Sequence, residues 1–273
     1  MGKGVLAALP LAMFLMHQGI IMAAANADTM PWSYEGVTGP SHWGELSEDY
    51  IMCKQGKNQS PIDIVDATFD RLFTLEFEYK TVPLRLNKPQ HTLEINYGVL
   101  SDRASANTVE IDGVTLPLPS LNSYNSQLVI SGETYTLRSI GFRIPSEHSF
   151  ENTHYAMEAQ LLHKNKHNQY AVVSVLFEQG EENGFVEKLG EYNAEDRSTN
   201  IRINANELLP KDKGYYHYRG SLTTPPCTEG VRWFVLKEAV SISQEQLEPF
   251  SKAQKNYVRP KQPRNFRYLL ESL

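Results

Sequence analysis

Histidine and cysteine are the side chains of this chain best suited to hold a transition metal, because imidazole nitrogens and thiolates are its common protein ligands. Two histidines, His163 and His167, flank a short polar turn, where they could bind a metal adventitiously. The other histidines after residue 27 are His42, His91, His148, His154 and His217. We interpret all of them as hydrogen-bonded or solvent-exposed groups rather than as a designed metal site.

The chain has two cysteines, Cys53 and Cys227. In an oxidising compartment a single long-range disulfide is the economical interpretation, and two free thiols are the alternative. A loop of this length would stabilise the fold by about 5 kcal/mol in the chain-entropy model.

The first residues are typical of a secretory signal peptide. Lys3 precedes an apolar run that reaches Ile21, and the small-residue pattern Ala25-Asn26-Ala27 follows. We predict a signal peptide over residues 1–27 and an exported protein, periplasmic or secreted. An uncleaved membrane anchor is the alternative, which two polar residues inside the run disfavour. No later segment is long and apolar enough to span a bilayer.

Without residues 1–27 the chain keeps 25 basic and 32 acidic residues, a formal charge of 25 − 32 = −7. This balance argues against nucleic acid and heparin-like polyanions as partners. The exception is a C-terminal basic cluster, which we interpret as solvated surface. It consists of Lys252, Lys255, Arg259, Lys261, Arg264 and Arg267.

The elements that must position these groups are mostly strands. From about residue 72, short alternating segments are separated by Gly, Pro, Asn and Asp, and Ser131-Gly132 indicates a hairpin. Ser243 with Gln246 forms a capping-box pattern that predicts a helix over Gln244–Ala253, and Gly184–Tyr192 is a second expected helix. The expected strands are Phe73–Tyr79, Thr92–Asn96, Thr108–Asp112, Gln127–Ile130, Thr134–Ile144, Tyr155–His163 and Tyr170–Phe177.

The pattern predicts one domain over residues 28–273. Its fold class is mainly β or α+β, with a large, mostly antiparallel twisted central sheet and short peripheral helices. We find no internal repeat and no linker that would divide the chain.

Six separated segments carry distinctive motifs. They are Trp32-Ser33-Tyr34, Gly39-Pro40-Ser41-His42-Trp43-Gly44, Gly56-Lys57-Asn58-Gln59-Ser60-Pro61-Ile62-Asp63-Ile64, Pro145-Ser146-Glu147-His148, Tyr218-Arg219-Gly220-Ser221-Leu222-Thr223-Thr224-Pro225-Pro226-Cys227 and Arg259-Pro260-Lys261-Gln262-Pro263. In their order and spacing these motifs resemble the alpha-class carbonic anhydrases over almost all of residues 28–273. The resemblance implies the fold of that family and, from the placement of Cys53 and Cys227, the disulfide of its exported members.

In that family three histidines hold Zn²⁺ and leave a fourth position open for water. By the resemblance, the three ligand positions fall on Gly141, Arg143 and Gln160. Glycine has no side chain, the guanidinium has only donors, and one neutral amide oxygen suits zinc poorly. We therefore predict no metal here and no other cofactor.

The resemblance also assigns supporting positions. Ser139 stands where the family hydrogen-bonds its first histidine with glutamine, and Val99 stands at the proton-shuttle position, where a valine cannot relay protons. Thr223 and Glu147 match the pair that orients the zinc-bound hydroxide. Glu158 matches the carboxylate that orients the third ligand.

Arg143 suggests a physical account of the change. Without zinc the family's buried carboxylates, here Glu147 and Glu158, lose a balancing charge, and an unpaired buried carboxylate is costly. Our hypothesis is that the Arg143 guanidinium replaces part of the zinc charge.

We therefore expect an exported carbonic-anhydrase-like protein that is catalytically silent and acts as a binding or structural protein. Its partner would be a protein, a glycan or a small anion, since silent relatives serve as interaction, glycan-binding and storage proteins. The alternative is an active carbonic anhydrase with an atypical or absent metal, which the retained Thr223, Glu147 and Glu158 favour. Zinc content and CO₂ hydration distinguish the two.

Overall fold

The structure, a computed structural model, describes residues 32–87, 93–97, 108–111, 114–117, 125–190, 201–253 and 257–273. The predicted signal peptide over residues 1–27, the predicted shuttle position Val99 and His91 lie outside the described residues.

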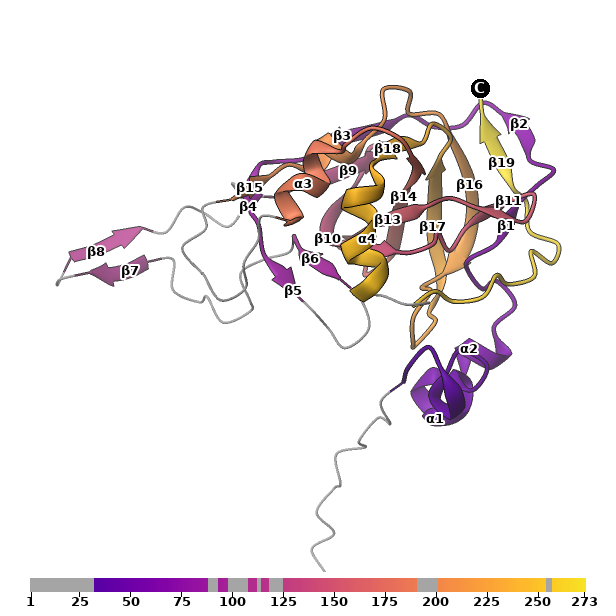
Figure 1. The fold of residues 1–273 in the computed structure, drawn as a ribbon. Coiled ribbons are helices and arrows are strands. Elements are labelled where there is room, and N and C mark those ends of the chain that lie inside the picture. The colour runs from indigo at the N-terminus through magenta and orange to yellow at the C-terminus, as the bar shows by residue number, and fades with distance from the viewer. Residues whose placement is uncertain are drawn as a thin grey trace, which may run out of the picture. The chain divides into compact units, whose positions relative to one another are not determined.

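One large sheet dominates the described part of the chain (Figure 1). Its main path is β2-β19-β16-β17-β14-β13-β10-β6-β5, with β18 beside β14, β9 beside β10, and β3 beside β9. The bounds are β2 Thr68–Asp70, β3 Leu75–Glu78, β5 Leu86–Asn87, β6 Glu94–Asn96, β9 Gln127–Ile130, β10 Glu133–Arg143, β13 Met157–Asn165, β14 Tyr170–Gln179, β16 Tyr215–Ser221, β17 Glu229–Leu236, β18 Val240–Ile242 and β19 Leu270–Ser272. The predicted sheet-dominated fold class is confirmed.

Most neighbouring strands are antiparallel, whereas β14 pairs with β17 and β18, and β19 with β2, in parallel. Smaller pairings join β1 Asp63–Ile64, β11 Ser149–Phe150 and β12 Thr153–His154; β4 Val82–Pro83 and β15 Arg202–Ile203; and β7 Thr108–Ile111 and β8 Val114–Pro117.

The centre of the sheet is covered on both faces. Residues 171–177 of β14 are all buried, and their alternate side chains enter two separate apolar clusters. Val173 and Val175 pack in the larger cluster with Phe142, while Val172 and Leu176 pack in the other. Burial on both faces explains why residues 171–177 are apolar, apart from Ser174, rather than alternating apolar and polar.

Helices are short and lie at the periphery (Figure 1): α1 Trp43–Leu46, α2 Met52–Gln55, α3 Gly184–Gly190 and α4 Gln244–Ala253. The capping box before α4 is confirmed: Gln246 N donates to Ser243 Oγ at 3.3 Å, and Ser243 N donates to Gln246 Oε1 at 3.4 Å. Leu247 of α4 packs against the larger core cluster, as the predicted helix face requires.

The hairpin prediction is also confirmed, since Ser131 and Gly132 have φ values of 52° and 80° and join β9 to β10. Several predicted strand bounds differ from the observed ones by one or more residues, and β13 is an example. β13 continues past His163 to Asn165, because the Asn165 side chain accepts hydrogen bonds from the backbone N–H groups of His167 and Gln169 and shortens the turn.

Cys53 and Cys227 form the predicted disulfide, with an S–S distance of 2.08 Å. The bond attaches α2 to the segment after β16, where Cys227 packs in a small buried cluster with Trp43 and Tyr34.

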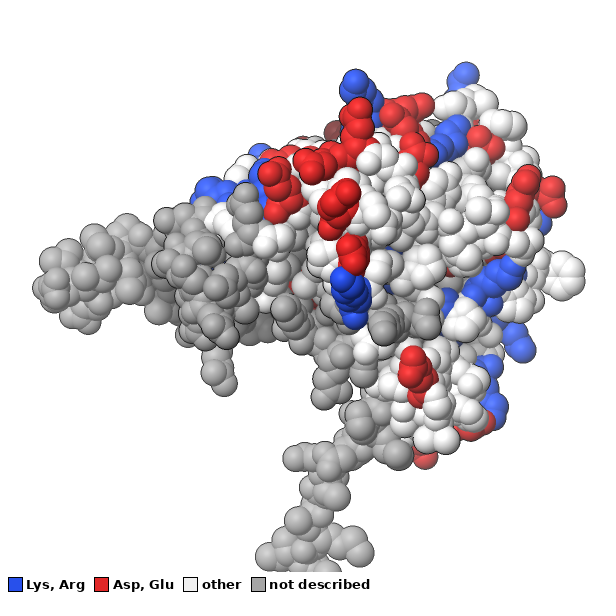
Figure 2. Space-filling model, viewed as in Figure 1, with Lys and Arg blue, Asp and Glu red and all other residues white. Residues whose placement is uncertain are grey.

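The solvated-surface interpretation of the C-terminal basic cluster is wrong for Arg259, which is 2% exposed. Its guanidinium lies over the Trp43 ring and Nη1 donates to the Ser60 carbonyl at 2.8 Å. Acidic groups gather over α3 and α4 on the face shown in Figure 2, where the sequence places the exposed residues Glu181, Glu182, Glu187, Glu245 and Glu248. In the part of the chain that the structure describes, no helix is long and apolar enough to cross a membrane.

Candidate functional site

The positions that the sequence analysis singled out lie side by side on the main sheet. Gly141 of β10 is paired with Gln160 of β13 and, on its other edge, with Glu94 of β6. Arg143 is paired with Glu158. Paired residues of antiparallel strands project to the same face, and so do residues two apart on one strand. All five residues therefore share one face of the sheet.

The Arg143 side chain folds back over Gly141. A Cβ atom placed on Gly141 would lie 3.2 Å from Arg143 Nη1, and the next nearest atoms, at 3.8 Å, are Cζ and Nη2 of the same guanidinium. Nη1 donates to the Phe142 carbonyl at 3.0 Å, and the Arg143 side chain is only 9% exposed. The missing side chain at position 141 is thus what gives the guanidinium its place.

Arg143 pairs with a buried carboxylate. Its Nε atom lies 3.5 Å from Glu147 Oε2, and the Glu147 side chain is fully buried. The geometry is that of an ion pair rather than of a hydrogen bond, because Nε has no hydrogen-bond partner among the described residues. Burial is the largest single effect and would lower the pKa of Arg143, but the electrostatic effects of Tyr34, Glu147, Glu158 and Glu94 together raise it. The guanidinium is therefore a permanent buried cation.

Gln160 connects the two carboxylates of the site. Its Nε2 atom donates to Glu147 Oε2 at 2.8 Å and to Glu158 Oε1 at 3.1 Å. Its Oε1 atom accepts a long hydrogen bond, 3.4 Å, from Thr223 Oγ1. Thr223 thus donates to Gln160 rather than to Glu147, and both members of the predicted hydroxide-orienting pair contact the same amide.

Glu158 is the most heavily hydrogen-bonded group of the site. Its Oε2 atom accepts from the backbone N–H groups of Glu147 and His148, each at 2.9 Å. Its Oε1 atom accepts from His148 Nδ1 at 2.9 Å and from Ser174 Oγ at 2.8 Å. Burial opposes ionisation, but the charge and hydrogen bonds of His148 prevail and lower the pKa of Glu158 to about 2. Glu158 is therefore a carboxylate at neutral pH.

Ser139 lies two residues before Gly141 on β10, paired with Leu162 and Asn96. His163, in contrast, lies on the opposite face of β13, where Nε2 contacts the Tyr79 hydroxyl at 2.9 Å and burial lowers its pKa to about 3. It is a fully buried core histidine, and the expected hydrogen bond is made by Nε2 alone, because Nδ1 has no hydrogen-bond partner among the described residues. The described residues contain no group of three or more His, Cys, Asp or Glu side chains placed to hold a metal ion.

The donor set at positions 141, 143 and 160 does not fit Zn²⁺. Gly141 offers no ligand atom, and the Arg143 guanidinium lies in the space above it. Gln160 presents one neutral oxygen, which already accepts from Thr223. A site for zinc needs three or four nitrogen, sulfur or carboxylate ligands around an open position, and a buried cation beside it opposes a second one.

Sequence reasoning missed three groups that complete this site. Arg259 N donates to Glu147 Oε1 at 2.8 Å, and Tyr34 and Glu94 both act on the charge of Arg143. Burial of the neighbouring Tyr34 hydroxyl raises its pKa to about 12. Tyr34 and Arg259 do lie in the motifs Trp32-Ser33-Tyr34 and Arg259-Pro260. That signal could have placed both residues near the site.

Comparison with known proteins gives a consistent assignment. The model of the eukaryotic-type carbonic anhydrases matches residues 38–272. A carbonic anhydrase from Klebsiella pneumoniae is 40% identical over 246 residues, covering 88% of this chain and 90% of its own.

Solved structures agree. The alpha-carbonic anhydrase from Thermovibrio ammonificans, in complex with the inhibitor sulfanilamide, has a TM-score of 0.74 at 37% identity and covers 88% of this chain and 98% of its own. Dioscorin complexed with ascorbate has a TM-score of 0.72 at 31% identity, covering 89% and 99%. The chain therefore belongs to the eukaryotic-type, or alpha-class, carbonic anhydrase family.

Proposed function

We propose that this protein is an exported, catalytically silent member of the family, in which Arg143 has replaced the zinc ion and which acts as a binding or structural protein. The family's ligand positions would be Gly141, Arg143 and Gln160. The observation that carries the proposal is the position of the Arg143 guanidinium, which fills the space over Gly141 and pairs with Glu147.

The chemistry lost is large. Zinc lowers the pKa of bound water to about 7 from about 15.7 in bulk water, which makes hydroxide available at neutral pH. The groups found at these positions supply no such effect. Glu147 and Glu158 already accept hydrogen bonds from Gln160 and its neighbours, so neither carboxylate is a free general base.

What remains is a closed ion network with a structural role. Arg143 is buried among carboxylates that act on its charge, those of Glu147, Glu158 and Glu94, and the second buried cation, Arg259, donates its backbone N–H to Glu147. These carboxylates do not favour an additional anion at Arg143 itself. A partner, whether protein, glycan or small anion, would therefore bind elsewhere on the domain. The dioscorin complexed with ascorbate is support for small-ligand binding on this fold.

Export is supported by the Cys53–Cys227 disulfide, since such bonds persist in oxidising compartments. The sequence pattern over residues 1–27 gives the same indication.

The test is a comparison of the purified protein with the triple variant Gly141→His, Arg143→His and Gln160→His. Both are dialysed against zinc, and metal content and CO₂ hydration are measured. The triple variant removes the guanidinium at the same time as it adds the ring at position 141, because a Cβ there would lie 3.2 Å from Arg143 Nη1. The proposal predicts that zinc binds to the triple variant and not to the unaltered protein. Stoichiometric zinc with substantial hydration in the unaltered protein would instead make it an active carbonic anhydrase.

A further inference from the structure

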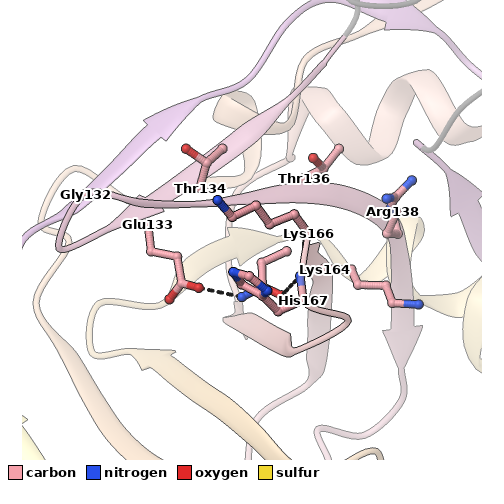
Figure 3. Close-up of a pocket in the computed structure, with 9 residues that line it drawn as sticks. Gly132, Glu133, Thr134, Thr136, Arg138, Lys164, Lys166 and His167 are labelled. Atoms are coloured by element: carbon pink, nitrogen blue, oxygen red, sulfur yellow. Dashed lines mark hydrogen bonds between the residues drawn. The ribbon is translucent and has the colours of Figure 1, made fainter.

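A second group of cations surrounds a cavity that is separate from the Arg143 site. The cavity has a volume of about 640 Å³ and lies between the start of β10 and the turn after β13 (Figure 3). Arg138, Lys164, Lys166 and His167 line it, and we call it the Lys164 pocket. It lies within the range of about 300–1,000 Å³ that is typical of small-molecule sites.

The sheet register brings three of the lining groups together. Thr136 of β10 is paired with Lys164 of β13, so both side chains project to one face. Thr134 lies two residues before Thr136 and is exposed. The pairing shifts between Leu137 and Ser139, which makes Arg138 the extra residue of a β-bulge. Bulges redirect a side chain, and they are common beside functional sites.

The turn after β13 holds the remaining groups in place. Asn165 Oδ1 accepts from the backbone N–H groups of His167 at 2.9 Å and Gln169 at 2.8 Å. Asn165 Nδ2 also donates to Glu133 Oε1 at 2.6 Å, the contact drawn in Figure 3, which attaches the turn to β10. Lys166 therefore extends from a braced turn rather than from a free loop. This reduces the entropy lost on binding.

In the described part of the chain, the cations of the pocket lack carboxylate partners, although Lys164 Nζ lies over the Tyr170 ring, 5.3 Å from its centre. Within the described ranges, Arg138, Lys164 and Lys166 make no ion pair with a carboxylate, and Arg138 Nε is buried without a hydrogen-bond partner. Glu133 is the one carboxylate in the lining, so the pocket carries a net charge of 3 − 1 = +2. The Glu133 carboxylate itself also accepts from the Tyr135 hydroxyl at 2.9 Å. The whole chain has a charge of −6, so this positive pocket is a local feature.

We propose that the Lys164 pocket binds a phosphate group, as the free ion or as the monoester of a small molecule. A guanidinium offers a planar pair of donors, and ammonium groups are point charges that suit a doubly charged tetrahedral oxyanion. The Thr134 and Thr136 hydroxyls add neutral donors. The cavity exceeds what one phosphate fills, which leaves room for the rest of a monoester. The proposal is independent of whether the protein binds zinc.

The test is isothermal titration of the purified protein with inorganic phosphate, glucose 6-phosphate, glucose and acetate at low ionic strength. The decisive variant is Lys164→Gln/Lys166→Gln, and the matched control is Lys211→Gln/Lys213→Gln, which removes two exposed charges from another loop. We expect saturable binding of phosphate, weaker binding of acetate and none of glucose. The decisive variant should weaken phosphate binding about tenfold or more, while the control leaves it unchanged.

Tighter binding of glucose 6-phosphate than of phosphate would identify a monoester as the ligand, and the reverse would identify the free ion. The proposal is overturned if phosphate shows no saturable binding, or if both double variants weaken it equally. It is also overturned if Lys164→Gln/Lys166→Gln binds with unaltered affinity, because the ion then lies elsewhere, for instance at Arg143. Thermal melting of each variant confirms that it is folded.

Discussion

Replacing Arg143 with methionine tests the idea that its charge balances the buried carboxylates. Methionine keeps most of the side-chain length but removes the cation 3.5 Å from Glu147 Oε2. Breaking a buried ion pair by removing one partner costs about 3–5 kcal/mol. Glu147 would keep its hydrogen bonds from Gln160 and from the Arg259 backbone, so we expect the lower end, about 3 kcal/mol. At about 2–4 °C per kcal/mol for a domain of this size, the melting temperature should fall by about 6–12 °C.

The assay is thermal unfolding of Arg143→Met at several pH values, with the exposed Arg71→Met as the control. The control should stay within about 0.5 kcal/mol. The deficit of Arg143→Met should be full near pH 7 and should shrink as the pH falls towards 2, where protonation of Glu158, whose pKa is lowered to about 2, removes part of the unbalanced charge. In a double-mutant cycle, Glu147→Gln should recover part of the loss. An unchanged melting temperature, or a deficit of equal size at every pH, would refute charge replacement.

Three further outcomes follow from the structure. The pKa of Glu158 is lowered from 4.5 to about 2, so its ionisation should contribute about 3 kcal/mol to the free energy of unfolding above pH 4.5, and this contribution should disappear as the pH falls towards 2. Acid-unfolding curves of Glu158→Gln should lack this pH-dependent contribution. Reducing the bond between Cys53 and Cys227, which are 174 residues apart, should lower the free energy of unfolding by about 5 kcal/mol in denaturant titrations, and a change below about 1 kcal/mol would contradict it. Gly141→His alone should destabilise the protein by about 1–3 kcal/mol, because its Cβ would lie 3.2 Å from Arg143 Nη1. Adding Arg143→His to Gly141→His should recover stability. If the free-energy effects of the two changes simply add, a side chain at position 141 does not compete with the Arg143 guanidinium for space.

The strands of the sheet were accessible from the sequence because they depend on local patterns. Alternation identified β10 and β13, and residues two apart on a strand share a face, so the spacing alone places Gly141 and Arg143 together. The same holds for α4, whose Ser243 and Gln246 side chains form a capping box within one turn.

The electrostatics of the site were not accessible in the same way. Arg259 belongs to a run of basic residues that composition assigns to the surface, yet its backbone N–H contacts Glu147, 112 residues earlier in the chain. The Arg259 cation is buried by tertiary contacts with Ser60 and Trp43, which lie far from it in the sequence. No local sequence pattern specifies such contacts. The Lys164 pocket was missed for a related reason, because a bulge at Arg138 breaks the alternation that the sequence analysis relied on.

The most direct test of zinc replacement is anomalous diffraction at the zinc absorption edge from crystals grown with zinc. Our account predicts no anomalous peak among Gly141, Arg143 and Gln160, and electron density for the Arg143 guanidinium over Gly141 beside Glu147. A fully occupied zinc ion at that position, with the guanidinium displaced, would contradict it.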